Sequence, residues 1–288
     1  AHSGRTPPCA KSLAEAGIAR VVIACVDPYP PVRGRGIAIL RRAGVSVTVG
    51  VMEKDARALN AGFITRVTRG RPLVVLKLAM SLDGKIAASS GDSKWISSAK
   101  SRDLVHRWRS ECDAVMVGAG TVIADNPRLT SRVAGGRDPI RVVVDGRLRT
   151  PADARVYRIE SKAGAILVTT RANLSRARRK YARSGVEVLG MPAHRGEIDL
   201  MALMREFGRR GWRQVMLEGG AHLAGSALAA GIVDRIALFV APRIIGDGIP
   251  AISGLDFRRV RDSIQAADLT ARQVDSDWLF EGRIAKRR

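Results

Sequence analysis

The stretch that decides the fold is "QVMLEGGAHLAGSALAAG", residues 214–231. An apolar run typical of a buried strand leads into two glycines and then into an apolar segment with helical spacing. The free N–H groups and dipole at the start of such a helix suit a pyrophosphate. The stretch is not the G-x-G-x-x-G fingerprint, so a tight turn that needs glycine for steric reasons explains it equally well. Glu218 precedes the glycines, where a carboxylate suits a substrate amide or amine better than a phosphate.

Strands and helices alternate on both sides of this stretch. Residues 73–80, 114–120, 140–146, 165–170, 186–190 and 235–242 read as strands, and residues 97–113 and 199–211 read as helices. The tail at 269–284 predicts two closing strands. This alternation predicts an α/β fold with a mostly parallel sheet covered on both faces.

A separate, smaller α/β unit precedes this sheet. Residues 20–28 and 45–51 read as strands, residues 34–44 as a helix, and residues 53–70 as one further helix ended by Gly70. The "GRP" at 70–72 is a natural boundary. We therefore expect two domains, residues 1–70 and 72–288.

Composition limits the function classes. The chain has 288 residues, is 46% hydrophobic and carries a net charge of +22, which raises nucleic-acid binding as a hypothesis. There is no long basic block, and aromatic residues are only 4%, so we instead expect the charge to attract anionic small molecules. No apolar run is long enough to span a bilayer. The three cysteines form no disulfide framework, which predicts a reducing, cytoplasmic setting.

Further polar segments follow the predicted strands. "VVVDGRLR" at 142–149 and "LVTTRA" at 167–172 offer arginines and threonines that could bind an adenosine 2′-phosphate, or they are ordinary basic turns. The serine-rich loop at 81–103 contains Trp95, which could stack on a planar ring or cap the core. Thr121, Asp125 and Arg132 follow the strand at 114–118.

In this order, "SLDGKIA" (81–87), "GDSKWISS" (91–98), "GAGTVIADNPRLTSR" (118–132), "IRVVVDGR" (140–147) and "LEGGAHLAGSAL" (217–228) closely resemble the reductase half of the bifunctional deaminase–reductase family of riboflavin biosynthesis. The resemblance covers essentially all of residues 72–288. It implies a dihydrofolate-reductase-like fold with NADPH as cofactor. The implied reaction reduces the ribose of 5-amino-6-(5-phosphoribosylamino)uracil to a ribityl chain by hydride transfer to C1′.

The resemblance also implies the site residues. At the substrate it implies Ser93, Arg109, Leu129, Arg132 and Glu218, with the two arginines on the phosphate and Glu218 on the aminouracil. At NADPH it implies Ala79, Trp95, Thr121, Asp125, Gly146, Gly220, Ala221, His222, Leu223, Ala224, Gly225 and Ser226. Gly146 takes a position where relatives can carry Ser, so Arg147 or Arg171 could replace that contact to the 2′-phosphate. We predict Lys77 and Glu218 as catalytic residues, with Lys77 polarising or orienting the opened ribose.

The head of the chain, residues 2–45, resembles the last part of that family's zinc deaminase half, a cytidine-deaminase-like α/β unit. In the family, zinc is bound by the His of an H-x-E motif, the Cys of a P-C pair and a later Cys, which corresponds to Cys9. The sequence begins just after the expected P-C cysteine and has no H-x-E. Because a zinc deaminase needs three protein ligands and a Glu, we expect deamination only in an intact, longer protein. Either this chain is a fragment of such a protein, which we favour, or its head is a relic that only packs.

Two other functions remain as alternatives. One is a related pyrimidine or pterin reductase of the same fold, against which the paired Arg109 and Arg132 favour a phosphorylated substrate. The other is a basic nucleic-acid-binding protein, whose binding would depend steeply on salt. The resemblance further suggests a homo-oligomer.

Overall fold

The structure is a computed structural model that describes residues 8–285, and the chain divides into two compact units, Ala1–Pro72 and Leu73–Arg288. The first unit contains α1 (Cys9–Glu15), β1 (Arg20–Ile23), α2 (Arg35–Arg42), β2 (Ser46–Val49), α3 (Glu53–Leu59) and α4 (Ala61–Arg69). Strands β1 and β2 pair in parallel, and their small core contains Ala10, Leu40 and Val45. The single helix predicted over 53–70 is wrong. It is two helices, because Asn60 ends α3 and begins α4.

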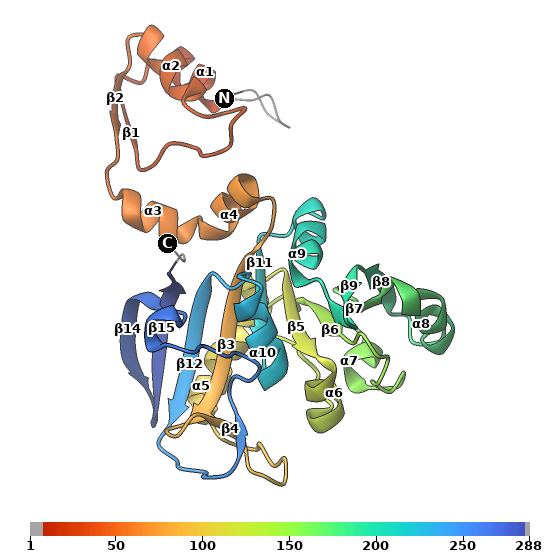
Figure 1. Ribbon diagram of the computed structural model, residues 1–288. Coiled ribbons are helices and arrows are strands. Elements are labelled where there is room, and N and C mark those ends of the chain that lie inside the picture. The colour runs from red at the N-terminus through yellow and green to blue at the C-terminus, as the bar shows by residue number, and fades with distance from the viewer. Residues whose placement is uncertain (1–7, 286–288) are drawn as a thin grey trace. The chain divides into compact units, whose positions relative to one another are not determined.

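The second unit is built on a nine-stranded sheet in the order β14-β15-β12-β3-β11-β5-β6-β7-β8 (Figure 1). The strands are β3 (Leu73–Ser81), β5 (Ala114–Gly118), β6 (Ile140–Val144), β7 (Ala165–Thr170), β8 (Glu187–Met191), β11 (Gln214–Glu218), β12 (Arg235–Ala241), β14 (Ala266–Val274) and β15 (Asp277–Ile284). Seven of them, from β12 to β8, are parallel. The two closing strands predicted at 269–284 are β14 and β15, and the structure shows that they pair antiparallel to each other and to β12.

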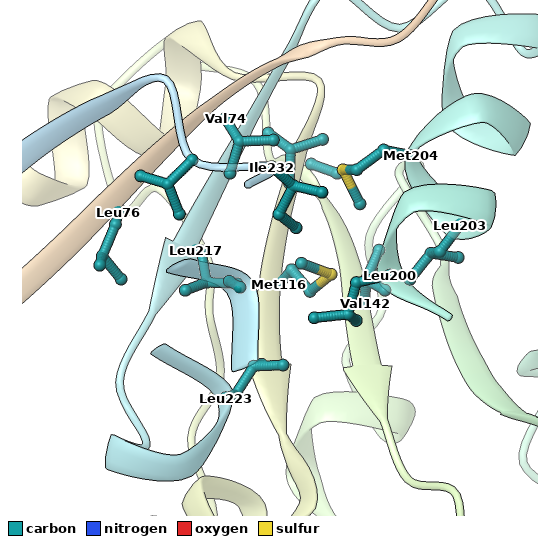
Figure 2. Packing of buried hydrophobic residues seen from close by; sticks show 14 of the residues in the cluster. Val74, Leu76, Met116, Val142, Leu200, Leu203, Met204, Leu217, Leu223 and Ile232 are labelled. Carbon is teal, nitrogen blue, oxygen red and sulfur yellow. The ribbon is translucent and has the colours of Figure 1, made fainter. Parts of the chain in front are cut away.

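Helices cover both faces of this sheet. On one face, α9 (Leu200–Arg209) and α10 (Ala221–Ala229) pack on Val74, Met116 and Leu217, as Figure 2 shows for α9 through Leu200, Leu203 and Met204. The other face is covered by α5 (Ala99–Glu111), α6 (Ala119–Asp125), α7 (Arg155–Arg158) and α8 (Leu174–Lys180). Burial on both faces explains why these strands read as continuous apolar runs. The predicted sheet architecture is confirmed.

Two short pairings lie outside the prediction. β4 (Lys85–Ala87) pairs with β13 (Ile249–Pro250), and β9 (Ala193–His194) forms a hairpin with β10 (Glu197–Ile198). Asp83 ties the first pair together, because its carboxylate accepts hydrogen bonds from the backbone N–H groups of Ile245 and Gly246. The hydrogen bond from the Ser81 hydroxyl, followed by those from the two backbone N–H groups, lowers the pKa of Asp83 to about 2.

Gly225 in α10 packs directly on the chain that crosses it. A Cβ added there would lie 1.8 Å from the carbonyl oxygen of Ser253. We expect Gly225→Ala to lower the free energy of unfolding by about 1–3 kcal/mol, because the backbone at Ser253 must move. Chemical denaturation measures this. Gly120→Ala in α6 is the matched control, since its Cβ would meet no atom within 4 Å. Equal stability of the two variants would contradict the packing argument.

Candidate active site

A cavity of about 1050 Å³ lies across the carboxyl ends of β3, β11, β5 and β6. Glu218, Gly118 and Asp145 reach its wall from the ends of β11, β5 and β6, and Lys77 reaches it from the middle of β3. In open parallel sheets this edge is where ligands bind, because loops and helix N-termini meet there. All residues that line the cavity belong to the second unit.

Three charged side chains gather at one end of the cavity. Glu218 and Lys77 are register partners on β11 and β3. Arg109, from α5, forms a two-point ion pair with Glu218, with Nε–Oε1 at 2.7 Å and Nη2–Oε2 at 2.8 Å. The remaining terminal nitrogen of Arg109 donates to the carbonyl of Thr130 at 3.1 Å. Arg109 therefore has a hydrogen-bond partner for each of its three nitrogens.

Burial and the charges of the three groups act against each other in this cluster. Burial raises the pKa of Glu218, but Arg109 and Lys77 together lower it by more, so the net shift is downward. Burial lowers the pKa of Arg109, but the charge and hydrogen bonds of Glu218 outweigh that effect, so the net shift is upward. For Lys77, burial lowers the pKa, Arg109 adds to the shift, and Glu218 offsets only part of it. The ion pair is thus held charged, whereas Lys77 gives up its proton more readily than an exposed lysine.

Lys77 is the cluster member that is open to a ligand. Its Nζ lies 5.7 Å from the centre of the Phe239 ring and lines the cavity. Among residues 8–285 it makes no hydrogen bond or ion pair, so its N–H donors are available. A buried ammonium with unused donors can hydrogen-bond, or protonate, a group that enters beside it.

The turn after β11 forms a cradle for a ligand. Gly219 and Gly220 have φ of +64° and +78°, and a Cβ on Gly220 would lie 3.1 Å from Thr121 Oγ1. These glycines bring the backbone at the N-terminus of α10 close to α6. The cradle is continuous with the lysine end of the cavity and fits the diphosphate of a dinucleotide.

Most of the residues expected at the site line this cavity. They are Lys77, Ala79, Ser93, Arg109, Thr121, Asp125, Leu129, Gly146, Glu218, Gly220, Ala221, His222, Leu223 and Ser226. The Ser93 hydroxyl also donates to Asp125 at 3.0 Å, which ties the serine-rich loop to α6. Leu129 has a φ of +56° and is buried.

Four expected residues do not line it. Ala224 is fully buried in the core, and Gly225 faces Ser253, because these positions of α10 point away from the cavity. Trp95 is 60% exposed, with the Arg102 guanidinium 4.4 Å from its ring centre. Arg132 is exposed, and burial together with the cations Arg109, Arg128 and Arg155 lowers its pKa.

Sequence reasoning also missed part of the wall. The β9–β10 hairpin contributes Gly196, Glu197 and Ile198, and the β4–β13 pair contributes Ile86 and Ile249. Only the Arg195-Gly196 pair, a turn signal, could have revealed the hairpin.

Cys9 begins α1 and is exposed. No group of three or more His, Cys, Asp or Glu residues that could hold a metal occurs within residues 8–285, so the described residues do not fit a zinc site. His2 lies outside that range. The zinc-ligand role of Cys9 stays a prediction.

Fold and site together define the second unit as a reductase domain with a dihydrofolate-reductase-like fold, the fold of its structural neighbours. A family model described as the RibD C-terminal domain matches residues 72–280. The chain belongs to the RibD family.

Whole-chain relatives agree with this family. The riboflavin biosynthesis protein RibD of Synechocystis sp. is 39% identical over 98% of this chain and 76% of its own length. RibD of Escherichia coli is 37% identical, over 96% and 77%. Among solved structures, Acinetobacter baumannii RibD has a TM-score of 0.86 at 33% identity, covering 99% of this chain and 78% of that one.

A solved Thermotoga maritima protein, described as a diaminohydroxyphosphoribosylaminopyrimidine deaminase/5-amino-6-(5-phosphoribosylamino)uracil reductase, also has a TM-score of 0.86. It is 35% identical and covers 99% of this chain and 76% of that one. No helix in the described part of the chain is both long and apolar enough to cross a membrane.

Proposed function

We propose that the second unit reduces 5-amino-6-(5-phosphoribosylamino)uracil to its ribitylamino form with NADPH, in riboflavin biosynthesis. The observation that carries the proposal is the cavity that joins the Lys77–Glu218–Arg109 cluster to the glycine cradle of α10, in a member of the RibD family. Relatives that share this family and fold are named as riboflavin biosynthesis proteins and as a reductase of this substrate.

The reaction needs an opened sugar. When the ribosylamine opens, the bond from C1′ to the ring oxygen breaks, the nitrogen lone pair forms C1′=N, and the ring oxygen gains the proton that nitrogen loses. NADPH, when bound, supplies a hydride to C1′. Nitrogen then takes a proton, which gives a secondary amine and completes the addition of two hydrogen atoms.

The chain's own residues would align and polarise this system. Lys77 would donate a hydrogen bond to the opened ribose, since its N–H groups are unused. Glu218 would accept from the amino or amide N–H groups of the uracil. Arg109 would act as a positioning residue that fixes Glu218, because its nitrogens are already engaged. This assignment replaces the phosphate role expected for Arg109.

The substrate phosphate would then bind Arg132, whose neighbours Arg128 and Arg155 add positive charge. Because Arg132 is exposed and does not line the cavity, this role requires the phosphate end of the substrate to extend out of the cavity. NADPH would lie with its diphosphate over Gly219 and Gly220, beside Thr121. Asp125 would keep the Ser93 loop in place. A homo-oligomer remains a prediction.

The test is NADPH oxidation at fixed salt with two substrates, the deaminated phosphoribosylaminouracil and its undeaminated pyrimidine precursor. Oxidation with the first, and a product heavier by two hydrogen atoms in mass spectrometry, is the expected result. A reaction without added substrate is the blank. Oxidation with neither substrate contradicts the proposal. Oxidation with the precursor alone would show that the enzyme reduces the undeaminated pyrimidine and not the deaminated uracil.

A further inference from the structure

The segment that follows α6, residues 126–132, has a backbone conformation that side chains rarely adopt. Asn126, Leu129 and Arg132 have φ of +42°, +56° and +55°. None of them is a glycine, so the left-handed conformation costs free energy at each position. A segment of this kind keeps its conformation only where contacts with the rest of the fold hold it. We call residues 126–132 the Leu129 loop, after the residue through which it lines the cavity.

Both ends of the Leu129 loop are attached to neighbouring elements. The side-chain oxygen of Asn126 accepts a hydrogen bond from the backbone N–H of Arg155, at the start of α7, at 2.8 Å. Ser131 is buried, and its backbone N–H donates to the carboxylate of Asp138 at 2.8 Å. Between these two attachments, the carbonyl oxygen of Thr130 is held from α5.

Two side chains of α5 contact the Thr130 carbonyl. Arg109 Nη1 donates to it at 3.1 Å, and His106 Nδ1 lies 3.3 Å from the same oxygen. His106 and Arg109 are three positions apart, which places them on one face of the helix. A carbonyl oxygen has two lone pairs and can accept from both side chains. Because Arg109 is also paired with Glu218, this contact connects the Leu129 loop to the charged cluster in the cavity.

The surroundings of His106 decide which of its ring nitrogens carries the proton. Burial, followed by the charges of Arg109 and Arg132, lowers the pKa of His106, and Thr130 and Glu218 offset only part of this. The ring is therefore neutral at neutral pH and has one N–H group. Because a carbonyl oxygen can only accept, that N–H is at Nδ1. Arg109 Nη1 is 3.5 Å from this nitrogen, too far to compete with the carbonyl.

His106 lies behind the Leu129 loop, away from any ligand. Leu129 and Arg109 line the cavity, whereas His106 does not. Without the Nδ1–H donor, the Thr130 carbonyl would depend on Arg109 alone, and the left-handed residues on either side of it could relax. Relaxation would move Leu129 in the cavity wall and Arg132 at its rim.

We propose that His106 is a positioning residue for the substrate: its Nδ1–H holds the Thr130 carbonyl and so keeps the Leu129 loop in the conformation that receives the phosphoribosyl end. This inference rests on the proposed function, since it concerns the substrate of that site. The loop binds the end of the substrate that does not react. Loss of the donor should therefore raise KM and leave kcat nearly unchanged.

The experiment compares His106→Leu, His106→Asn and Arg107→Leu with the parent chain. The measurements are steady-state NADPH oxidation over a range of substrate concentrations at neutral pH and fixed salt, and the dissociation constant of NADPH by calorimetry. For His106→Leu we expect KM to rise about three- to tenfold, with kcat within about twofold and NADPH binding unchanged. His106→Asn should restore a KM close to that of the parent, because its amide nitrogen lies where Nδ1 lies.

Arg107→Leu is the matched control, because Arg107 is exposed on the same helix and does not line the cavity. It should behave as the parent does. A parental KM in His106→Leu would overturn the inference, and so would the same rise in KM in Arg107→Leu or in His106→Asn. A lower kcat and fewer NADPH sites at an unchanged KM would show that His106 only supports folding. A parent chain that does not oxidise NADPH with this substrate would refute the proposed function, and the inference with it.

Discussion

Replacing Lys77 by Met is expected to slow the reduction by about two to three orders of magnitude while NADPH binds almost as before. Met has a similar length and fits a buried site, but it has no N–H donor for the opened ribose. The measurement is single-turnover NADPH oxidation, together with the dissociation constant of NADPH. Lys162→Met is the control, because Lys162 is exposed and lies outside the cavity. An unchanged rate with intact binding would remove Lys77 from the mechanism.

The pH profile tests the same role independently. Burial, with a further contribution from Arg109, lowers the pKa of Lys77. If its ammonium is the donor, kcat/KM should fall as pH rises through this lowered value, below the range of an exposed lysine. The residual activity of Lys77→Met should lack that limb. Because the unfolded chain binds more protons between the lowered and the ordinary pKa, the stability contribution of Lys77 rises with pH in that window.

Much of the second unit could be predicted from the sequence because its strands are buried on both faces. Continuous apolar runs such as residues 114–118 and 165–170 mark such strands, and their polar ends mark the edge where the cavity forms. The glycines at 219 and 220 likewise predict a tight turn with no room for a side chain. The structure agrees, because a Cβ on Gly220 would lie 3.1 Å from Thr121 Oγ1.

The parts that could not be predicted depend on tertiary contacts. Nothing in the residues around Arg109 shows that its guanidinium meets Glu218, which is 109 positions away. A run of consecutive helical residues from 220 to 226 was expected at the cofactor, yet a helix turns Ala224 and Gly225 toward its packing partners. The hairpin at 193–198 is too short and too polar to carry a periodic signal.

Breaking the Arg109–Glu218 pair from one side is expected to cost about 3–5 kcal/mol of the free energy of unfolding. Arg109 and Glu218 are only 12% and 9% exposed, so Glu218→Leu would leave a guanidinium charge with little water around it. Arg109→Met would likewise leave the Glu218 carboxylate buried without its partner. The double variant should regain most of this loss, because it removes both charges. Urea unfolding of the parent, the two single variants and the double variant completes a double-mutant cycle, which gives the coupling free energy between Arg109 and Glu218.

The pH dependence has a definite sign. Burial raises the pKa of Glu218, but Arg109 and Lys77 bring it below its ordinary value. The pair's contribution to stability is therefore complete above the ordinary pKa of glutamate and is lost as pH falls through the lowered one. The double variant should lack this component of acid sensitivity. Strictly additive single losses would show that the pair is not coupled. A double variant that is stable yet inactive would separate the two roles of Glu218. Stability needs only the absence of an unpaired charge, whereas the role proposed for Glu218 in the reduction needs the carboxylate itself.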